Sequence, residues 1–157
     1  MRKRIIDHRP LDVKADEYDW VDLERLAQVE ITSEDVDHPI ESALIPRMGS
    51  GWRAAQPGEQ TIRLRFDEPL RIKRIRLVFH EDEQERTQEF VLRWSSDGGQ
   101  SYREIVRQQY NFSPPGAARE LEDYDIDLDG VTVLELRIVP DISGGSIRAS
   151  LAQLRLA

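Results

Sequence analysis

The feature that most constrains this chain is the segment 88–106, in which two stretches of alternating residues flank a tight turn. Phe90, Leu92 and Trp94 alternate with other side chains, which is the period-2 pattern of a strand that buries one face. An Asp-Gly-Gly run follows at 97–99, and these residues tolerate the positive φ angles that hairpin turns require. The segment therefore predicts an antiparallel β-hairpin whose three large apolar side chains belong to the core.

The same alternation recurs in short segments along the rest of the chain. A three-residue step between the buried positions Ile72 and Ile75 predicts a β-bulge. Behind Asp19 the apolar residues are spaced as in a helix, so we expect one short helix at 20–27. The other alternating segments are expected to be strands at 28–33, 61–66, 70–79, 121–128, 133–139 and 148–156. Many short strands with one short helix predict an all-β fold, an antiparallel β-sandwich or jelly roll.

Length and composition narrow the classes of protein further. A chain of 157 residues fits one domain, in which we expect residues 1–27 to form an arm and short helix packed on a sandwich of residues 28–157. There is no cysteine, which excludes disulfides and thiolate metal sites. The net charge of −8 disfavours non-specific nucleic-acid binding, and no apolar run approaches the roughly 20 residues that cross a bilayer. Asp7 ends the apolar run near the start, so we expect a cytoplasmic protein that binds neither nucleic acid nor membrane.

Loop lengths distinguish the two ends of the predicted sandwich. Successive connections of an antiparallel chain alternate between its ends, so connections of one kind gather together. The tight turns are expected at 67–69, 96–99 and 129–130, and the long loops at 35–58, 80–87, 109–119 and 140–147. Binding residues concentrate on long loops held by a rigid scaffold, so we expect the ligand site at the long-loop end.

The candidate ligand-binding residues are aromatic or hydrogen-bonding side chains in or beside these long loops. They are Arg47, Trp52, Arg53, His80, Arg86, Tyr110, Asn111, Phe112 and Arg148. Flat aromatic faces beside forked donors recognise sugars or peptide side chains. We expect residues 110–112 to stand on a loop that Pro114-Pro115-Gly116 keeps out of the sheet. The alternative is that Trp52 and Phe112 plug that end of the core.

Two acidic segments have alternative interpretations as metal sites. Residues 125–130 match the start of a calcium-binding loop, but its twelfth position is Leu136 instead of glutamate. The aspartates there also alternate with apolar residues, which favours a strand with a carboxylate-rich outer face. Residues 80–83, His-Glu-Asp-Glu, contain metal-ligand types, but His8 and His38 are distant in sequence. We expect no metal and no cofactor.

A row of arginines on neighbouring strands also has two interpretations. Arg63, Arg65, Arg76 and Arg93 share the outward parity and could follow a phosphate backbone. Alternatively they pair across strands with carboxylates, which the charge balance favours. The carboxylates in question are Glu122, Asp125, Asp127 and Glu135. The common catalytic motifs are absent and no carboxylate pair is singled out among 30 acidic residues, so we expect no enzyme.

The order of several segments resembles the discoidin, or coagulation factor 5/8 type C, domain. The segments are Val29–Glu34, His38–Leu44, Gly51–Arg53, Gln60–Phe66, Ile72–Phe79, Glu89–Ser95, the turn at 97–99 with Tyr102, and Ala149–Leu156. The resemblance covers residues 28–157. It implies a galactose-binding-like jelly roll of eight strands, with a ligand end made of loops and often a structural calcium. Ile45-Pro46 and Gln153 stand where relatives offer carboxylate ligands, so we expect no calcium here.

The resemblance implies a non-catalytic module that binds a carbohydrate or glycan-like ligand through the long loops. Intracellular members of the family are protein-docking domains, so the alternative is an adaptor that uses the same end or the amino-terminal arm. An exposed aromatic platform beside polar donors would favour a sugar, whereas a broad apolar patch would favour a protein partner.

Overall fold

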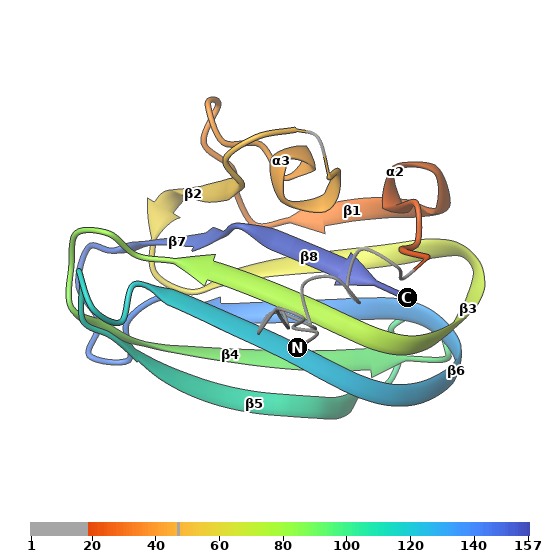
Figure 1. Ribbon diagram of the computed structural model, residues 1–157. Coiled ribbons are helices and arrows are strands. Elements are labelled where there is room, and N and C mark those ends of the chain that lie inside the picture. Colours follow the sequence, from red (N-terminus) through yellow and green to blue (C-terminus); the bar gives the residue numbers. More distant parts are fainter. Residues whose placement is uncertain (1–18, 47) are drawn as a thin grey trace, which may run out of the picture.

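The structure, a computed structural model, describes residues 19–46 and 48–157. The predicted arm before Asp19 and the candidate Arg47 lie outside the described residues. The described chain forms a β-sandwich with two one-turn helices at one edge (Figure 1). Its elements are α2 (Leu23–Leu26), β1 (Ala27–Ile31), α3 (Glu41–Leu44), β2 (Trp52–Pro57), β3 (Gln60–His80), β4 (Arg86–Ser95), β5 (Arg103–Phe112), β6 (Arg119–Val139), β7 (Arg148–Leu151) and β8 (Gln153–Leu156). The predicted all-β antiparallel sandwich is confirmed.

Two long strands, β3 and β6, build both layers of the sandwich. They pair antiparallel over nearly their whole length and fold over together, as Figure 1 shows. The first part of β3 also pairs with β1, while the second part pairs with β8. The last part of β6 pairs with β4, and β4 pairs with β5. One layer therefore has the order β1-β3-β6-β4-β5, and the other contains β8 with the remaining halves of β3 and β6.

The core fills the space between these layers. Ile62 and Leu64 in the first half of β3 are each 1% exposed, and Ile75 and Leu77 in its second half are fully buried. The rings of Phe79 and Phe90, one from each layer, stack with their centroids 5.4 Å apart. Burying this much apolar surface is the main stabilising term for such a sandwich.

The predicted hairpin is confirmed as β4 and β5, which pair from Arg86↔Phe112 to Trp94↔Arg103. Gly98 and Gly99 in its turn have φ angles of +75° and +93°, the left-handed region that glycine adopts without a Cβ penalty. Phe90 and Leu92 are fully buried, as predicted. Trp94 is only partly buried, and the guanidinium of Arg103 lies over its ring at 5.7 Å. The prediction that Trp94 is a core residue is therefore wrong in degree, because the ring lies near the end of the sandwich.

Several predicted boundaries are corrected. The expected helix at 20–27 is one turn, α2, because Ala27 already starts the ladder of β1 with β3 and so short a helix gains little by itself. The predicted loop 35–58 contains α3 and the strand β2, which pairs with β7. Positions 67–69 and 129–130 are not turns between strands but bends inside β3 and β6. The bulge between Ile72 and Arg74 is confirmed by a register shift.

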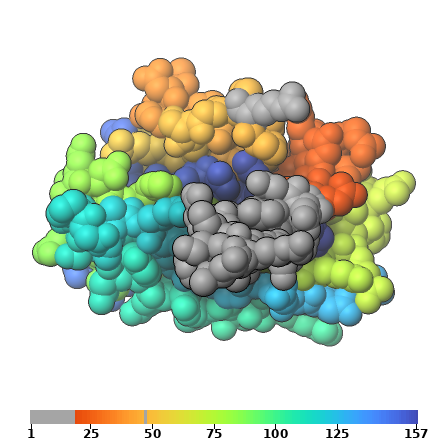
Figure 2. Space-filling view, viewed as in Figure 1, coloured from red at the N-terminus to blue at the C-terminus, as the bar shows by residue number. Residues whose placement is uncertain are grey.

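Residues 28–46 and 48–50 form one edge of the molecule. In Figure 2 their orange surface lies above β7 and β8, of which only part remains visible. Arg155 of β8 is 8% exposed and donates to the carbonyl of Ala43 in α3 at 2.7 Å, which anchors this edge to the sandwich. No helix in the described part of the chain is long and apolar enough to cross a membrane.

Candidate functional site

A polar cleft of about 350 Å³ lies where the loops after β3 and before β7 meet the segment 35–58. Its lining combines two arginines and two histidines with acidic, amide and hydroxyl side chains. The lining residues are His38, Ser50, Trp52, Arg53, His80, Glu81, Asp82, Glu83, Gln84, Ser146, Ile147, Arg148 and Ser150. Three of the predicted long loops, those starting at residues 35, 80 and 140, therefore contribute to one site.

The two-stranded ribbon of β2 and β7 positions one wall of this cleft. Arg53 is the register partner of Ser150, and Pro57 is the partner of Arg148. The backbone of Arg53 is held on its other side, because its N–H donates to His38 and its carbonyl accepts from Asp35. Both arginine side chains are exposed, so the ribbon presents two forked donors from fixed backbone positions.

The hydrogen-bond donors of the cleft differ in whether they already bind other groups of the protein. Within the described residues, the side chains of Arg53 and His80 are exposed and make no hydrogen bond or ion pair. Arg148 has a carboxylate oxygen of Asp35 3.7 Å from its guanidinium. A hydrogen bond from the N–H of Asp37, together with His38 and Arg148, holds the pKa of Asp35 below its usual value. The Nδ1 atom of His38 is buried, 3.8 Å from Asp35, and has no hydrogen-bond partner in the described part of the structure.

The acceptors come from the segment that follows β3. Arg86 donates to Glu81 at 2.6 Å, and the N–H groups of Glu83 and Gln84 donate to the same side chain. Burial alone would raise the pKa of Glu81, but these bonds hold it below its usual value. The next residue, Asp82, is exposed and its carboxylate has no partner among the described residues. The cleft thus offers both a hydrogen-bond acceptor and donors that are available to a ligand.

The structure brings together four of the nine predicted site residues, namely Trp52, Arg53, His80 and Arg148. Trp52 is only 1% exposed, and its indole N–H donates to the carbonyl of Ser33 at 3.0 Å. The alternative that Trp52 plugs the core is therefore confirmed. Its ring supports the floor of the cleft and offers no face for stacking.

Arg86 and Phe112 are also structural. Both are buried, and the guanidinium of Arg86 lies 4.6 Å from the centre of the Phe112 ring. Arg86 additionally donates to the carbonyl of Pro140 at 2.8 Å, which ties the loop after β6 to β4. The prediction that these two side chains face a ligand is wrong, because both are buried and the guanidinium of Arg86 is bound by Glu81 and by the carbonyl of Pro140.

The prediction that residues 110–112 stand on a loop outside the sheet is also wrong. They end β5, where Tyr110 pairs with Gln88 and Asn111 with Thr87. The hydroxyl of Tyr110 donates to the carbonyl of Arg119 at 3.0 Å, and Asn111 accepts a bond from Thr87 at 2.7 Å. β5 runs to Phe112, four residues into the loop predicted at 109–119, and the first of the prolines follows at position 114.

Sequence reasoning missed several lining residues. His38 was set aside because it is distant from His80 in sequence, although both lie in long-loop segments predicted to share one end. Asp82 was weighed only as part of the acidic run 80–83, Ser50 carries no motif beyond its place in the loop 35–58, and Ser150 lies in a predicted strand that no local signal connects to the site. Tertiary pairing of β2 with β7 is what places Ser150 opposite Arg53.

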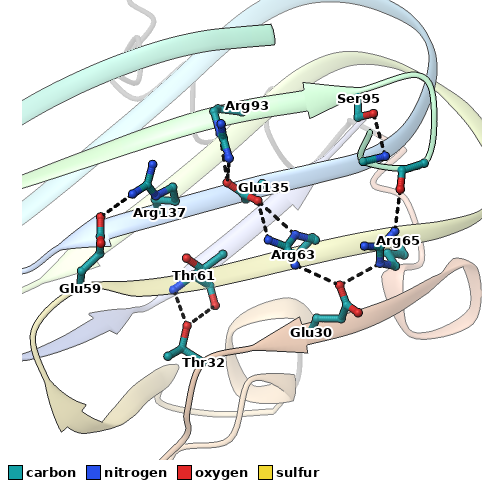
Figure 3. Close-up of polar contacts among 12 residues, drawn as sticks. Glu30, Thr32, Glu59, Thr61, Arg63, Arg65, Arg93, Ser95, Glu135 and Arg137 are labelled. Carbon is teal, nitrogen blue, oxygen red and sulfur yellow. Dashed lines mark hydrogen bonds and ion pairs between the residues drawn. The ribbon is translucent and has the colours of Figure 1, made fainter. Parts of the chain in front are cut away.

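Cross-strand ion pairing of the outward arginines is confirmed (Figure 3), but of the four expected carboxylates only Glu135 pairs with any of them among the described residues. Arg63 and Arg93 both donate to Glu135, which is 1% exposed, and Arg65 donates to Glu30 at 2.8 Å. On the other layer, Arg76 donates to Asp123 at 2.8 Å. These arginines are therefore occupied, and the phosphate-binding alternative receives no support from the sheet face.

The two acidic segments that were weighed as metal sites, residues 125–130 and 80–83, show no sign of one in the described part of the chain. Residues 125–130 lie inside β6, where Asp125 is the register partner of Arg74, so the strand interpretation is confirmed. Among the described residues, no three histidine or carboxylate side chains gather as a group that could hold a metal ion.

No protein-family model and no curated protein matches this sequence. Solved structures match its fold. The family 32 carbohydrate-binding module of AlyQ in complex with 4,5-unsaturated mannuronic acid is 14% identical, with a TM-score of 0.64 over 89% of this chain and 98% of that one. The family 32 module of Clostridium perfringens NanJ in complex with galactose is 12% identical, with a TM-score of 0.64 over 87% and 96%.

A pectin-binding carbohydrate-binding module is 16% identical, with a TM-score of 0.61 over 84% of this chain and 90% of that one. At such identities the likeness shows a shared fold. Family 32 modules share the galactose-binding-like fold with discoidin domains, so the architecture implied by the sequence resemblance is present.

Proposed function

We propose that this protein is a non-catalytic carbohydrate-binding module and that a sugar binds in the polar cleft lined by Arg53, His80 and Arg148. The observation that carries the proposal is the coincidence of two features. The fold is that of modules solved with galactose and with an unsaturated uronic acid. The same molecule has, at its loop end, an open cleft in which the side chains of Arg53, His80 and Asp82 make no hydrogen bond or ion pair with the described residues.

The chemistry of the cleft suits a polyhydroxylated ligand. A sugar hydroxyl both donates and accepts hydrogen bonds, so it is best held where both kinds of partner are within reach. Arg53 and His80 supply donors and Asp82 supplies an acceptor, all exposed. Since Trp52 is buried, recognition in this cleft rests on hydrogen bonds instead of on stacking against an aromatic face.

Glu81 in the cleft and Asp35 beside it are both held by hydrogen bonds, and both are unsuited to donating protons. A general acid at neutral pH needs a raised pKa, whereas the pKa values of Asp35 and Glu81 are both lowered. A binding role without a chemical step is therefore the simpler assignment.

A protein-docking role is less well supported. The large apolar side chains exposed in the described structure come from separate segments. They are Val36, Met48, Leu121 and Ile142. Exposed apolar residues of this kind are normal on a protein surface and do not by themselves indicate a partner.

The proposal is tested by a glycan-array screen followed by calorimetric titration of the strongest hits. We expect Arg53→Ala and His80→Ala each to weaken binding by about 1–2 kcal/mol, or roughly tenfold, without lowering the melting temperature. Arg71→Ala is the matched control, because Arg71 is an exposed arginine whose guanidinium pairs with Asp127 outside the cleft. The proposal fails if no glycan binds, or if Arg71→Ala weakens binding as much as Arg53→Ala.

A further inference from the structure

A second cleft adjoins the first. It has a volume of about 380 Å³ and continues past His80 toward the start of β6 and the start of β8. Ser50, His80, Asp82 and Ser150 line both clefts. The residues that belong to the second cleft alone include Arg119 and Gln153. The two clefts are therefore parts of one continuous surface, with the side chains of His80 and Asp82 at their junction.

The second cleft also carries hydrogen-bonding groups that the protein leaves unused. Arg119 is the register partner of His80 at the end of the β3–β6 ladder, and both side chains are exposed. Within the described residues, the side chains of Arg119 and Gln153 make no hydrogen bond or ion pair. This differs from the sheet faces, where arginines such as Arg63 and Arg76 are bound to carboxylates.

The charges across the joined clefts balance. The arginines are Arg53, Arg119 and Arg148, and the carboxylates are Glu81, Asp82 and Glu83. Three positive and three negative side chains line the joined clefts, so neither a strongly anionic nor a strongly cationic ligand is favoured. A surface with both donors and acceptors and no net charge matches a neutral, hydroxyl-rich chain.

We infer that the two clefts together bind a neutral oligosaccharide of at least two sugar units. One unit contacts Arg53 and the next contacts Arg119 and Gln153, with His80 between them. Ligand pockets begin at about 300 Å³, so each cleft has the size of a site for one small unit. This inference rests on the proposed function and adds to it the length and charge class of the ligand.

The test compares single sugars with short chains of the same sugar. Calorimetric titrations would use galactose with galactotriose, glucose with cellotriose, and mannose with mannotriose, and trigalacturonate as an anionic probe. We expect one neutral trisaccharide to bind at least tenfold more tightly than its own monosaccharide, because only the chain reaches the second cleft.

Variants then assign the gain to the second cleft. Arg119→Ala and Gln153→Ala should each lower the affinity for the trisaccharide at least threefold. The affinity for the monosaccharide should stay unchanged. Arg53→Ala should weaken both ligands. Arg71→Ala, with its guanidinium paired to Asp127, should change neither.

The outcomes separate this inference from the proposal on which it rests. If a monosaccharide and its trisaccharide bind equally well, or if Arg119→Ala and Gln153→Ala leave the trisaccharide's affinity unchanged, the extended site is wrong while the sugar-binding module stands. If trigalacturonate binds more tightly than every neutral chain, the neutral ligand class is wrong. If neither these sugars nor any glycan on the array binds, both the module and its extended site are overturned.

Discussion

Glu135 is a buried carboxylate that two partly exposed arginines from neighbouring strands share (Figure 3). Burial works against its charge, but the bonds from Arg93 and Arg63 hold its pKa below the usual value. It also lies in the middle of the ladder, paired with Arg63 on β3 and Arg93 on β4. A single side chain therefore connects the outer faces of three strands.

Replacing this carboxylate tests how much the bridge contributes. Glu135→Gln keeps the shape but leaves two guanidinium groups facing a neutral amide, and we expect a loss of about 3 kcal/mol in the free energy of unfolding. The control is Glu59→Gln, since Glu59 and its partner Arg137 are both well exposed, and it should cost less than about 1 kcal/mol. Urea unfolding of the three proteins measures both values. Equal costs would show that burial adds nothing to the bridge.

Glu120 is the buried carboxylate that lacks an arginine. It is 1% exposed, accepts a bond from Gln88 at 3.2 Å, and has its second oxygen without a partner in the described structure. Burial and the neighbouring carboxylate of Glu122 raise its pKa to about 8. The folded protein therefore keeps this proton at pH values where the unfolded chain, with a pKa near 4.5, has lost it.

This difference predicts a pH-dependent stability. Because the folded pKa is the higher one, the contribution of Glu120 is most favourable below about pH 4.5 and is lost as the pH rises to about 8. Glu120→Gln mimics the protonated form, so it should raise the melting temperature more at pH 9 than at pH 5. Thermal melts of both proteins at pH 5, 7 and 9 provide the measurement. An identical difference at all three values would contradict the raised pKa.

At the scale of elements, the ribbon of β2 and β7 positions one wall of the cleft. Gly51 precedes β2 and has a φ angle of +93°. A Cβ atom there would lie 2.6 Å from the carbonyl oxygen of Leu151 and 2.8 Å from the Cα of Ala152. Both are backbone atoms, so the segment between β7 and β8 would have to move. Only glycine allows β2 to approach so closely.

Two glycine substitutions separate backbone strain from the clash. Gly49 has a φ angle of +100°, but a Cβ atom there would meet nothing within 4 Å. We expect Gly49→Ala to cost about 1 kcal/mol, from the left-handed conformation alone. Gly51→Ala should cost a further 1–3 kcal/mol, because the packed backbone must shift. Chemical unfolding compares them, and equal costs would show that β7 yields freely to the added methyl group.

At the scale of the whole molecule, the folding over of β3 with β6 lets one pair of strands serve both layers. Their ends then bring the loop after β3, the start of β6 and the loop after β6 to the same end of the sandwich, as Figure 1 shows. The N–H of Glu81 donates to Ala118, and the N–H of Ile142 donates to Thr87, so these connections brace one another. The proposed binding surface rests on this bracing.

The expectation that calcium is not required for folding is also tested on the whole protein. Gln153 is exposed in the second cleft, and Ile45-Pro46 replaces the other carboxylate position that the family resemblance implies. Thermal melts with calcium and with a chelator should superimpose. A chelator-induced drop of more than about 4 °C, which corresponds to roughly 1 kcal/mol or more in a domain of this size, would show a metal site.

The sequence by itself determined most of the strands and their buried faces, but not β2 or the continuity of β3 and β6 through positions predicted as turns. The alternation of Ile62, Leu64 and Phe66 and the turn at 97–99 are local patterns, since a period of two and a positive φ are properties of adjacent residues. The pairing of outward arginines with carboxylates followed from charge balance. The crowding of long loops at one end followed from the antiparallel order of the strands.

The binding surface was decided only by the tertiary structure. Trp52 and Phe112 lie in the core, and the guanidinium of Arg86 donates to Glu81 and to the carbonyl of Pro140, so none of the three is available to a ligand. Arg53 and Arg119 became available because their register partners, Ser150 and His80, are not carboxylates. Exposure and partnership depend on atoms brought from distant parts of the chain, so no window of sequence contains them.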